Sequence, residues 1–465
     1  MNTPKAKEFL EQTISIIDLT QIDLTQTTEQ TMHRKILHIA LPSIFTNITV
    51  PLLGIVGTYI AAHLGAQFLA AISVGSTLFS TTYSLFNFLR MGTGGVAAQT
   101  YGAEQFAESG VVLGRSLVIA LSLSLGILLL QQPIIELGLW LMSVEGAQRV
   151  LVMNYFHWLI WGAPAMLSLF ALNGWLLGMQ NAFYPMVVAV TQNLLNIGIS
   201  VFLVYALHMK IEGVAIGALT AQWVGAILAL CFAIRVARQH GIGLFSQGHR
   251  VFRDLIAWKR FFTVNVFIFL RTLCLVAVMF SFTAFGNRSG NYVVAGNAIL
   301  LQLFLLTSYF LDGFAYAGEA VGGRITGQGD GQSFRRLVRA LFLWGGIIAL
   351  LFSLFFGVAG DVIVQQLGQD AQIIAVARTY LPYVIALPVV SVTAFLFDGL
   401  YIGTTATRSM LIGVAFASAL FFLLYQLLAP TLGNHALWIA FTAYLALRGG
   451  VMALQLPGVL RRKFG

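Results

Sequence analysis

The sequence predicts an all-α integral membrane protein with twelve transmembrane helices, arranged as two pseudo-symmetric six-helix lobes around a central cavity. Its 465 residues are 58% apolar and only 9% charged, with a mean hydropathy of +0.84. A soluble globular domain has about 25% charged residues, so the composition excludes that class. Uncharged apolar runs also reach the roughly 20 residues that span hydrocarbon, for example 340–360, 379–397 and 409–433.

Matching residues recur at a constant separation, which predicts a duplicated chain. Gly102 and Gly327 are 225 positions apart, since 327 − 102 = 225. The same separation joins four further pairs, which are Asn87 with Asp312, Asn173 with Asp398, Gly174 with Gly399, and Gly178 with Gly403. Repeated halves are a common architecture for transporters, in which the substrate route runs between the halves.

The chain divides into four predicted segments. They are a polar cytoplasmic tail (1–31), an N-lobe of helices 1–6 (32–235), a basic cytoplasmic linker (236–260) and a C-lobe of helices 7–12 (261–465). The tail contains a tandem pentapeptide, IDLTQ, at 17–21 and 22–26, and it lacks the basic start and apolar core of a signal peptide. The twelve expected spans are 36–62, 66–97, 111–132, 150–178, 183–207, 212–235, 261–285, 291–322, 337–359, 375–402, 409–431 and 435–456.

Basic residues gather on one side of this topology. Six lie in 235–260 against one acid, three follow the eighth span, and three end the chain, whereas the other side has only Arg149, Lys210, Arg288 and Arg378. The positive-inside rule therefore predicts that both termini and the linker are cytoplasmic. The net charge of +9 follows from this orientation and does not indicate nucleic-acid binding. The linker is expected to lie on the inner membrane surface as a short amphipathic basic segment.

The first span has the residues of a hinge. Pro42 and Pro51 each remove a backbone donor, and Gly54 and Gly57 lie close to them. Prolines also occur in the fourth and tenth spans, where a structural bend alone explains them.

Three acids fall within the body of a span: Asp312, Glu319 and Asp398. All three belong to the C-lobe, and a charge at the bilayer centre costs about 2.5–3.5 kcal/mol, so these acids require a reason to persist. They are the candidates for binding a coupling ion. The alternative is that they form fixed ion pairs with arginines at span depth, which are Arg90, Arg271 and Arg448.

Other polar residues at span depth are candidates for lining the cavity. Tyr316 shares a helix face with Asp312 and Glu319, because these acids are two turns apart. The other members of this set are Tyr401, Arg90, Arg271 and four asparagines: Asn173, Asn196, Asn265 and Asn297.

Several stretches resemble the multidrug and toxic compound extrusion (MATE) transporters. The lobe ends NGWLLGMQNAFYP (173–185) and DGLYIGTTATR (398–408) carry this resemblance. Further stretches are similar to the DinF (DNA-damage-inducible protein F) branch: VPLLGIVGTYIAAHLG (50–65), NFLRMGTGG (87–95), LDGFAYAGEA (311–320) and GNHALWIAFTAYLALRG (433–449). The resemblance covers roughly 33–460. It implies antiport, in which an organic cation or another amphipathic compound leaves as H+ or Na+ enters, and a cavity that alternates between inward-open and outward-open forms. It also implies a location in the bacterial inner (plasma) membrane.

The chain departs from the branch at three charged positions. Gly57 stands where the first helix usually carries an aspartate, and Ser200 follows Asn196 where the branch has N-x-x-x-D. The seventh helix has Asn265 and keeps Arg271, but lacks the charges of its usual N-R-D run. Two explanations stay open: either coupling depends on the C-lobe acids, or the protein is not proton-coupled.

The leading hypothesis is therefore a secondary-active exporter whose coupling is placed on the C-lobe acids. The alternative is a flippase or facilitator for a lipid-linked or amphipathic substrate without proton coupling. An enzyme is not expected, because the sequence has no metal-ligand spacing and no HExxH motif. The expected partners are a small amphipathic or cationic molecule and the lipid bilayer, with a monomeric chain and no cofactor besides the coupling ion H+ or Na+.

Overall fold

The computed structural model describes residues 29–243, 248–368 and 370–465. The tandem pentapeptide and most of the predicted N-terminal tail lie outside the described residues. Positions 29–31, the last three of that tail, already belong to the first helix, α2 (Glu29–Leu64).

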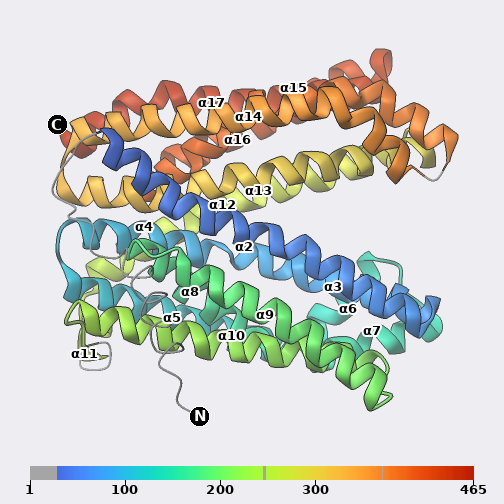
Figure 1. The fold of residues 1–465 in the computed structure, drawn as a ribbon, viewed down its shortest axis with the longest axis horizontal. Coiled ribbons are helices and arrows are strands. Elements are labelled where there is room, and N and C mark those ends of the chain that lie inside the picture. The colour runs from blue at the N-terminus through green and yellow to red at the C-terminus, as the bar shows by residue number, and fades with distance from the viewer. Residues whose placement is uncertain (1–28, 244–247, 369) are drawn as a thin grey trace, which may run out of the picture.

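The N-lobe is a bundle of helices that follow one another along the chain (Figure 1). After α2 come α3 (Ala66–Phe86), α4 (Phe88–Gly102), α5 (Phe106–Leu129), α6 (Gln131–Leu141), α7 (Gly146–Leu159), η1 (Ile160–Gly162), α8 (Ala163–Gly178), α9 (Phe183–Val201), η2 (Phe202–Ala206) and α10 (Ile211–Gln239).

The C-lobe repeats this arrangement with longer helices. They are α12 (Leu255–Asn287), α13 (Asn291–Gln328), α14 (Gly331–Leu367), α15 (Ala371–Gly403), α16 (Thr407–Leu432) and α17 (Asn434–Phe464), and the short α11 (Gly248–Arg253) precedes them. In the described part of the chain, eleven helical segments are long and apolar enough to cross a membrane, and α2 supplies the first predicted span.

The helix boundaries differ from the predicted spans at three interior points. The second predicted span is broken at Asn87, between α3 and α4, and the fourth is broken by the 3-10 turn η1 just before Pro164. The fifth ends in the π-helical turn η2. Hydropathy cannot reveal such breaks, because the broken segment stays apolar throughout. The linker is also shorter than predicted, since α10 continues to Gln239 and α12 begins at Leu255.

Glycine contacts show the duplication directly. A Cβ atom at Gly102 would overlap the carbonyl oxygen of Arg324, and one at Gly327 would overlap that of Gln99. These two contacts are the same contact repeated, because Arg324 is also 225 positions after Gln99 (324 − 99 = 225). The contacts are reciprocal across the two lobes. They bring the backbones of α4 and α13 so close that each contact position accommodates the α-hydrogen of glycine but no larger side chain.

The same relation holds within each lobe. Gly174 of α8 lies against the carbonyl oxygen of Arg90, and Gly399 of α15 against that of Ala315. The separation is 225 for both members, since 399 − 174 = 225 and 315 − 90 = 225. The predicted pseudo-symmetry of the two lobes is therefore confirmed at the level of individual backbone contacts.

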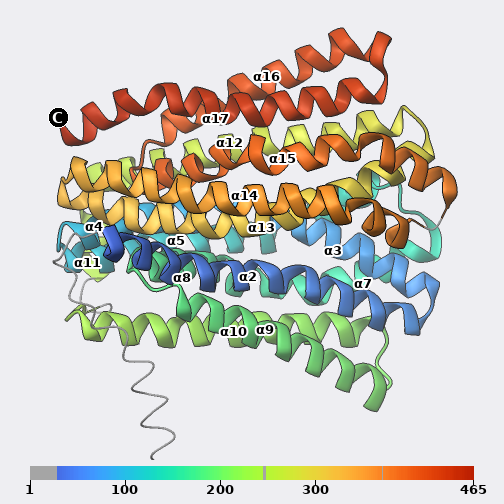
Figure 2. The same ribbon diagram turned by 45° about the horizontal axis from the view of Figure 1, so that its top comes forward.

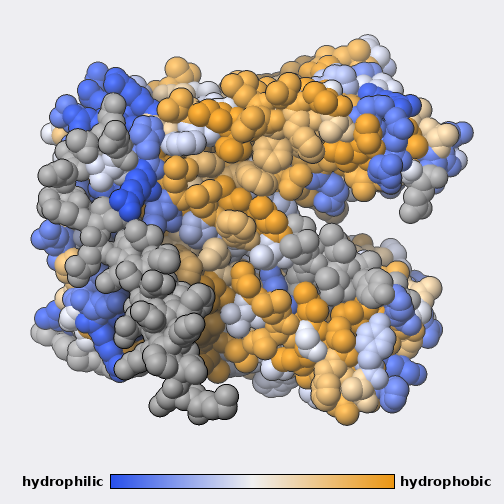
Figure 3. Space-filling view, in the orientation of Figure 1, coloured by the Kyte–Doolittle hydropathy of each residue, from blue (hydrophilic) through white to orange (hydrophobic). Residues whose placement is uncertain are grey.

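The two lobes meet at one end of the molecule and separate at the other. At the closed end, Gln99 Nε2 of α4 donates to Gly403 O of α15 at 2.8 Å, and Gln180 Nε2 donates to Ala320 O of α13 at 2.8 Å. Figure 3 shows a hollow between the lobes at the opposite end, away from the C-terminus marked in Figure 1. The helices α16 and α17 lie along one edge of the molecule, and α9 and α10 lie along the opposite edge (Figure 2).

The turn between α13 and α14 illustrates how the sequence ends and restarts its helices. Gly329 has φ 73°, a left-handed conformation that glycine adopts without steric cost, and its N–H bonds to Thr326 O. Asp330 then caps α14, because its Oδ1 accepts hydrogen bonds from the backbone N–H groups of Gln332 and Ser333 at 3.0 and 2.9 Å.

Candidate substrate and ion site

Six charged side chains from five helices line one cavity of about 190 Å³. The three arginines are Arg90 on α4, Arg271 on α12 and Arg448 on α17. The three acids are Asp312 and Glu319 on α13 and Asp398 on α15. All except the half-buried Asp312 are at most 9% exposed. The structure thus brings together the three acids that the sequence places in the body of a span, with Tyr316 beside them.

Asp398 is held by two arginines. Its Oδ2 accepts hydrogen bonds from Nη2 of Arg271 and from Nη2 of Arg448. Its other oxygen, Oδ1, has no hydrogen-bond partner among the described residues, and neither do the Nε atoms of the two arginines. One carboxylate therefore bonds to two guanidinium groups, which leaves this trio with a net charge of +1, and it still has an open acceptor position.

Glu319 is paired with Arg90 across the two lobes. Arg90 Nη1 lies 3.2 Å from Glu319 Oε2, and its guanidinium carbon lies 4.2 Å from the centre of the Tyr316 ring. Gly94, one turn beyond Arg90 on α4, leaves room for this carboxylate, because a Cβ there would overlap Glu319 Oε1. Arg90 Nε also approaches Asn87 Oδ1 at 3.4 Å, so the break between α3 and α4 faces the same arginine.

Asp312 differs from the other two acids. Within the described ranges it has no hydrogen bond and no ion pair within 4.0 Å, although it lines the cavity with Arg90, Arg271 and Arg448. Its counterpart at the repeat separation is Asn87, which cannot ionise. Asp312 is therefore the one cavity carboxylate that can bind a proton or a cation without first giving up a hydrogen bond from an arginine.

Arg448 completes the charge balance and was not among the predicted site residues. The sequence identified it as an arginine at span depth but did not assign it to the cavity. The sequence did contain an indication of its role, because the number of arginines at span depth, three, equals the number of acids there. With all six groups ionised the cavity is neutral, and protonation of one acid leaves a net charge of +1.

A second and larger cavity, of about 820 Å³, lies in the N-lobe. Gly57 and Ser200, the positions where the resemblance implies aspartates, both line it, as does the predicted site residue Asn196. Ser200 Oγ donates to Asn196 Oδ1 at 3.1 Å. The described lining of this cavity includes hydroxyl and amide groups but no Asp, Glu, Lys or Arg. Its polar walls therefore offer hydrogen bonds without a fixed charge.

Two predicted cavity residues instead tie helices together. Asn297 exchanges amide hydrogen bonds with Asn434, at 2.9 and 3.0 Å, and accepts a third from Trp438 Nε1 at 2.9 Å. Tyr401 is buried and donates to Met452 O at 2.6 Å, which joins α15 to α17. Neither residue is among those that line the two cavities, because their polar groups bond to neighbouring helices in this conformation.

The remaining two asparagines also lie outside the two cavities. Asn265 is buried, donates to Phe261 O at 2.8 Å, and packs where a Cβ at Gly92 would lie. Asn173 is half-buried on α8, next to the close contact between Gly174 and Arg90. The side-chain Oδ1 atoms of Asn265 and Asn173 have no partner in the described part of the chain.

The predicted hinge residues lie in one helix. α2 runs through Pro42, Pro51, Gly54 and Gly57 without an assigned break, and the side chains of Pro51 and neighbouring positions are outside the description. At Gly57 no atom lies within 4 Å of the position that a Cβ would occupy. The open space around Gly57 is compatible with bending, and the hinge stays a prediction.

Comparison with known families decides what kind of protein carries these cavities. The MatE family profile matches the chain twice, at residues 42–202 and 268–427, one match in each lobe. The chain belongs to the MatE family. The two matched regions are related by nearly the same separation as the glycine contacts, since 268 − 42 = 226 and 427 − 202 = 225.

Individual MatE relatives agree with this assignment. DNA damage-inducible protein F of Escherichia coli is 40% identical over 434 residues, which is 91% of each chain. The probable multidrug resistance protein NorM of Idiomarina loihiensis is 23% identical over 90% of this chain and 93% of its own. The predicted DinF branch is thus confirmed, and MatE transporters are not enzymes.

Solved MatE structures share the fold. A multidrug resistance MATE transporter in an outward-facing conformation has a TM-score of 0.83 at 19% identity, covering 95% of this chain and 100% of its own. A MOP superfamily transporter of Pyrococcus furiosus has a TM-score of 0.82, also at 19% identity and with the same coverage. This similarity supports the twelve-helix, two-lobe architecture, and the protein is a multi-pass membrane protein.

Proposed function

We propose that the protein is a secondary-active exporter that exchanges amphipathic or cationic compounds for H+ or Na+, with Asp312 as the carboxylate that binds the coupling ion. Membership of the multidrug efflux family supports export of small molecules as the general activity. The observation that carries the finer proposal is the cavity in which three arginines face three acids while Asp312 alone lacks a hydrogen bond or ion pair with the described residues.

The charge balance of this cavity supports competition between the ion and the substrate. Three ionised acids neutralise three arginines, so an ion that binds to Asp312 leaves an excess positive charge. An organic cation in or near the cavity is then repelled, since charges interact strongly where water is scarce. Ion and cationic substrate would therefore exclude each other, which is the requirement for antiport.

The uncharged N-lobe cavity supports placing the coupling in the C-lobe. Gly57 and Ser200 leave that cavity without an acidic or basic side chain among its described lining residues. Its volume of about 820 Å³ suits a drug-sized molecule, and its hydroxyl and amide groups can orient such a molecule. We assign substrate binding to this cavity and ion binding to the smaller one.

Alternating access would require the lobes to separate at the end of the molecule where they are in contact. The inward-open form requires α4 to part from α13 and α15, which breaks the glycine contacts and the hydrogen bonds of Gln99 and Gln180. The positive-inside rule assigns this closed end to the cytoplasm, because the basic chain end and linker lie there.

Reconstitution tests the proposal. Purified protein in lipid vesicles is expected to move ethidium, a fluorescent organic cation, when an H+ or Na+ gradient is imposed and to move it only downhill without one. Asp312→Asn should keep downhill movement and lose the response to the gradient. Asp361→Asn, which removes a C-lobe acid that is exposed and paired with Arg378, is the matched control and should behave like the unmodified protein. A gradient response that survives Asp312→Asn contradicts the proposal.

A second function, lipid flipping without ion coupling, is favoured by one observation. Three guanidinium groups line the charged cavity, and guanidinium binds phosphate through paired hydrogen bonds. Equal transport of a labelled anionic lipid with and without an ion gradient, together with no ethidium transport, would support this function in place of export.

A further inference from the structure

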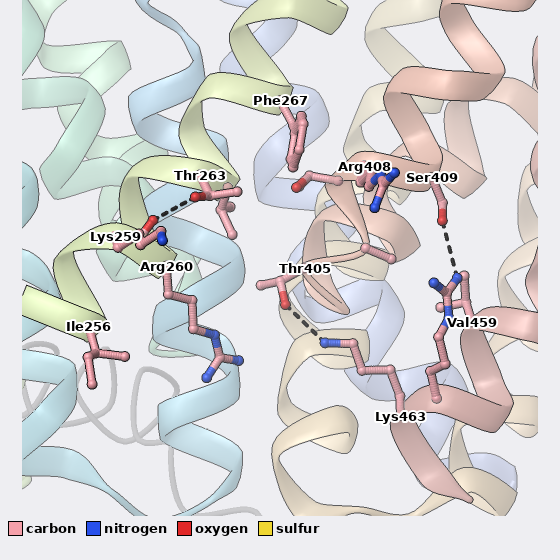
Figure 4. A pocket seen from close by; sticks show the side chains of 14 residues that line it. Ile256, Lys259, Arg260, Thr263, Phe267, Thr405, Arg408, Ser409, Val459 and Lys463 are labelled. Carbon is pink, nitrogen blue, oxygen red and sulfur yellow. Dashed lines mark hydrogen bonds between the residues drawn. The ribbon is translucent and has the colours of Figure 1, made fainter.

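A basic cleft lies at the closed end of the molecule, between α12 on one side and α16 and α17 on the other (Figure 4). Its volume is about 470 Å³. Five cations line it: Lys259 and Arg260 from α12, Arg408 from α16, and Arg462 and Lys463 from α17. Its lining residues include no acid, and none of the five cations forms an ion pair with any residue that the structure describes.

Two of the cations, both from α17, form hydrogen bonds to hydroxyl groups that line the cleft. Lys463 Nζ lies 3.2 Å from Thr405 Oγ1, and Arg462 Nη2 lies 3.4 Å from Ser409 Oγ. Figure 4 shows Lys463 extending across the opening to Thr405. Lys463 is half-buried and the other four cations are exposed, so the cluster is open to a ligand from solvent or from the membrane surface. Like charges gathered without an acid attract an anion, because an anion relieves their mutual repulsion.

The start of α16 adds a second feature that attracts anions. This 26-residue helix begins at Thr407, its N-cap Ala406 supplies no side-chain hydrogen bond, and its first turn contains no acid. The first N–H groups of a helix have no intrahelical acceptor and carry partial positive charge. Ala406, Thr407 and Arg408 all line the cleft, so these N–H groups lie beside the five cations.

Apolar side chains accompany the cations. Ile256 and Phe267 of α12 and Val459 of α17 line the same cleft. Ile256 is 83% exposed, and the adjacent Leu255 is 79% exposed, at the start of a helix that enters the membrane. Exposed apolar residues beside a basic cluster at a membrane edge contact acyl chains while the cations contact head groups.

We propose that this cleft binds the phosphate head group of an anionic membrane lipid, with the acyl chains along Ile256 and Phe267. The phosphate would neutralise the cation cluster and accept hydrogen bonds from the first turn of α16. The bound lipid would join α12, the first helix of the C-lobe, to α16 and α17. This inference goes beyond the proposed exchange activity and does not depend on it, because the cleft shares no lining residue with the charged cavity.

Lipid binding to the full-length protein in detergent tests this proposal. Thermal unfolding is measured with increasing phosphatidylglycerol, with phosphatidylcholine, and with soluble glycerol 3-phosphate. We expect saturable stabilisation by phosphatidylglycerol alone. Each cation near a membrane surface contributes about fivefold in affinity for anionic lipid, so Arg260→Gln/Arg408→Gln should weaken binding roughly 25-fold. Neither side chain has a hydrogen bond among those described, so the fold should tolerate the change.

The matched control removes two exposed arginines from α10, Arg235→Gln/Arg238→Gln. These positions lie in the same basic connection but outside the cleft, so the control should retain the affinity of the unmodified protein. Equal weakening by the two double variants would overturn the proposal, because it would indicate general surface attraction. Equal stabilisation by glycerol 3-phosphate would also overturn it, in favour of a site for soluble phosphate compounds, and so would equal stabilisation by phosphatidylcholine.

Discussion

Replacing Asp398 by Asn should destabilise the protein strongly. Asp398 Oδ2 is the only acidic partner, among the described residues, of both Arg271 and Arg448. The three residues are 4–6% exposed. Asparagine keeps the shape of the side chain but removes its negative charge, so two buried guanidinium groups lose their counter-charge. Removing one partner of a buried ion pair costs about 3–5 kcal/mol, and we expect a loss of this size in the free energy of unfolding.

Unfolding by SDS titration of the purified protein in detergent, followed by circular dichroism, measures this loss. The control is Asp361→Asn, because the ion pair of Asp361 with Arg378 is exposed and water compensates for its loss. Adding Arg448→Met to Asp398→Asn should restore part of the stability, since it removes one of the two uncompensated charges. The reasoning is refuted if Asp398→Asn is no more destabilising than Asp361→Asn, or if the second substitution adds its full cost to the first.

Three further predictions concern the helix contacts. Gly327→Ala should destabilise the protein by about 1–3 kcal/mol, because its Cβ would overlap Gln99 O. Gly346→Ala should leave the stability unchanged, because no atom lies within 4 Å of the new Cβ. SDS titration compares the two variants. Asn297→Ala should cost about 1–3 kcal/mol in the same assay, because it leaves two buried donors without their acceptor. Asp330→Ala should cost about 1 kcal/mol by removing a helix cap. Hydrogen bonding by Ser333 holds the pKa of Asp330 below its ordinary 3.8. The stability that the ionised cap contributes is therefore present above pH 3.8 and is lost as pH falls through the lower folded pKa. Unfolding measured at pH 7 and at pH 3 checks this, and an equal cost of Asp330→Ala at both would contradict it.

Much of the fold could be predicted from the sequence because a membrane imposes simple rules. Each span must be apolar and about 20 residues long, and each backbone group must bond within its helix, so hydropathy alone locates the helices. The repeat separation of 225 predicted two similar lobes, and the reciprocal contacts of Gly102 and Gly327 have that separation. The breaks at Asn87 and Ile160–Gly162 could not be predicted, because they interrupt apolar segments without changing their composition.

The site was only partly predictable. Charged residues within a membrane span are costly and are usually functional, and this rule identified Asp312, Glu319 and Asp398. These three acids do share a cavity. The sequence could not rank them, because partners such as Arg90 and Glu319 are 229 positions apart. Nor could it separate polar residues that face a cavity from those that join helices, as the pairing of Asn297 with Asn434 shows. Depth in the membrane follows from position along a helix, but the direction of a side chain depends on packing.

Ion displacement upon substrate binding tests the central claim most directly. Ethidium is added to the purified protein in weakly buffered detergent solution, and the release of H+ is followed with a pH-sensitive dye, or the release of Na+ with radioactive sodium. Because linkage is reciprocal, a substrate that competes with the ion must displace it. We predict the release of about one ion per ethidium bound in the unmodified protein and in Asp361→Asn. Asp312→Asn should release none. Undiminished ion release from Asp312→Asn would contradict the account.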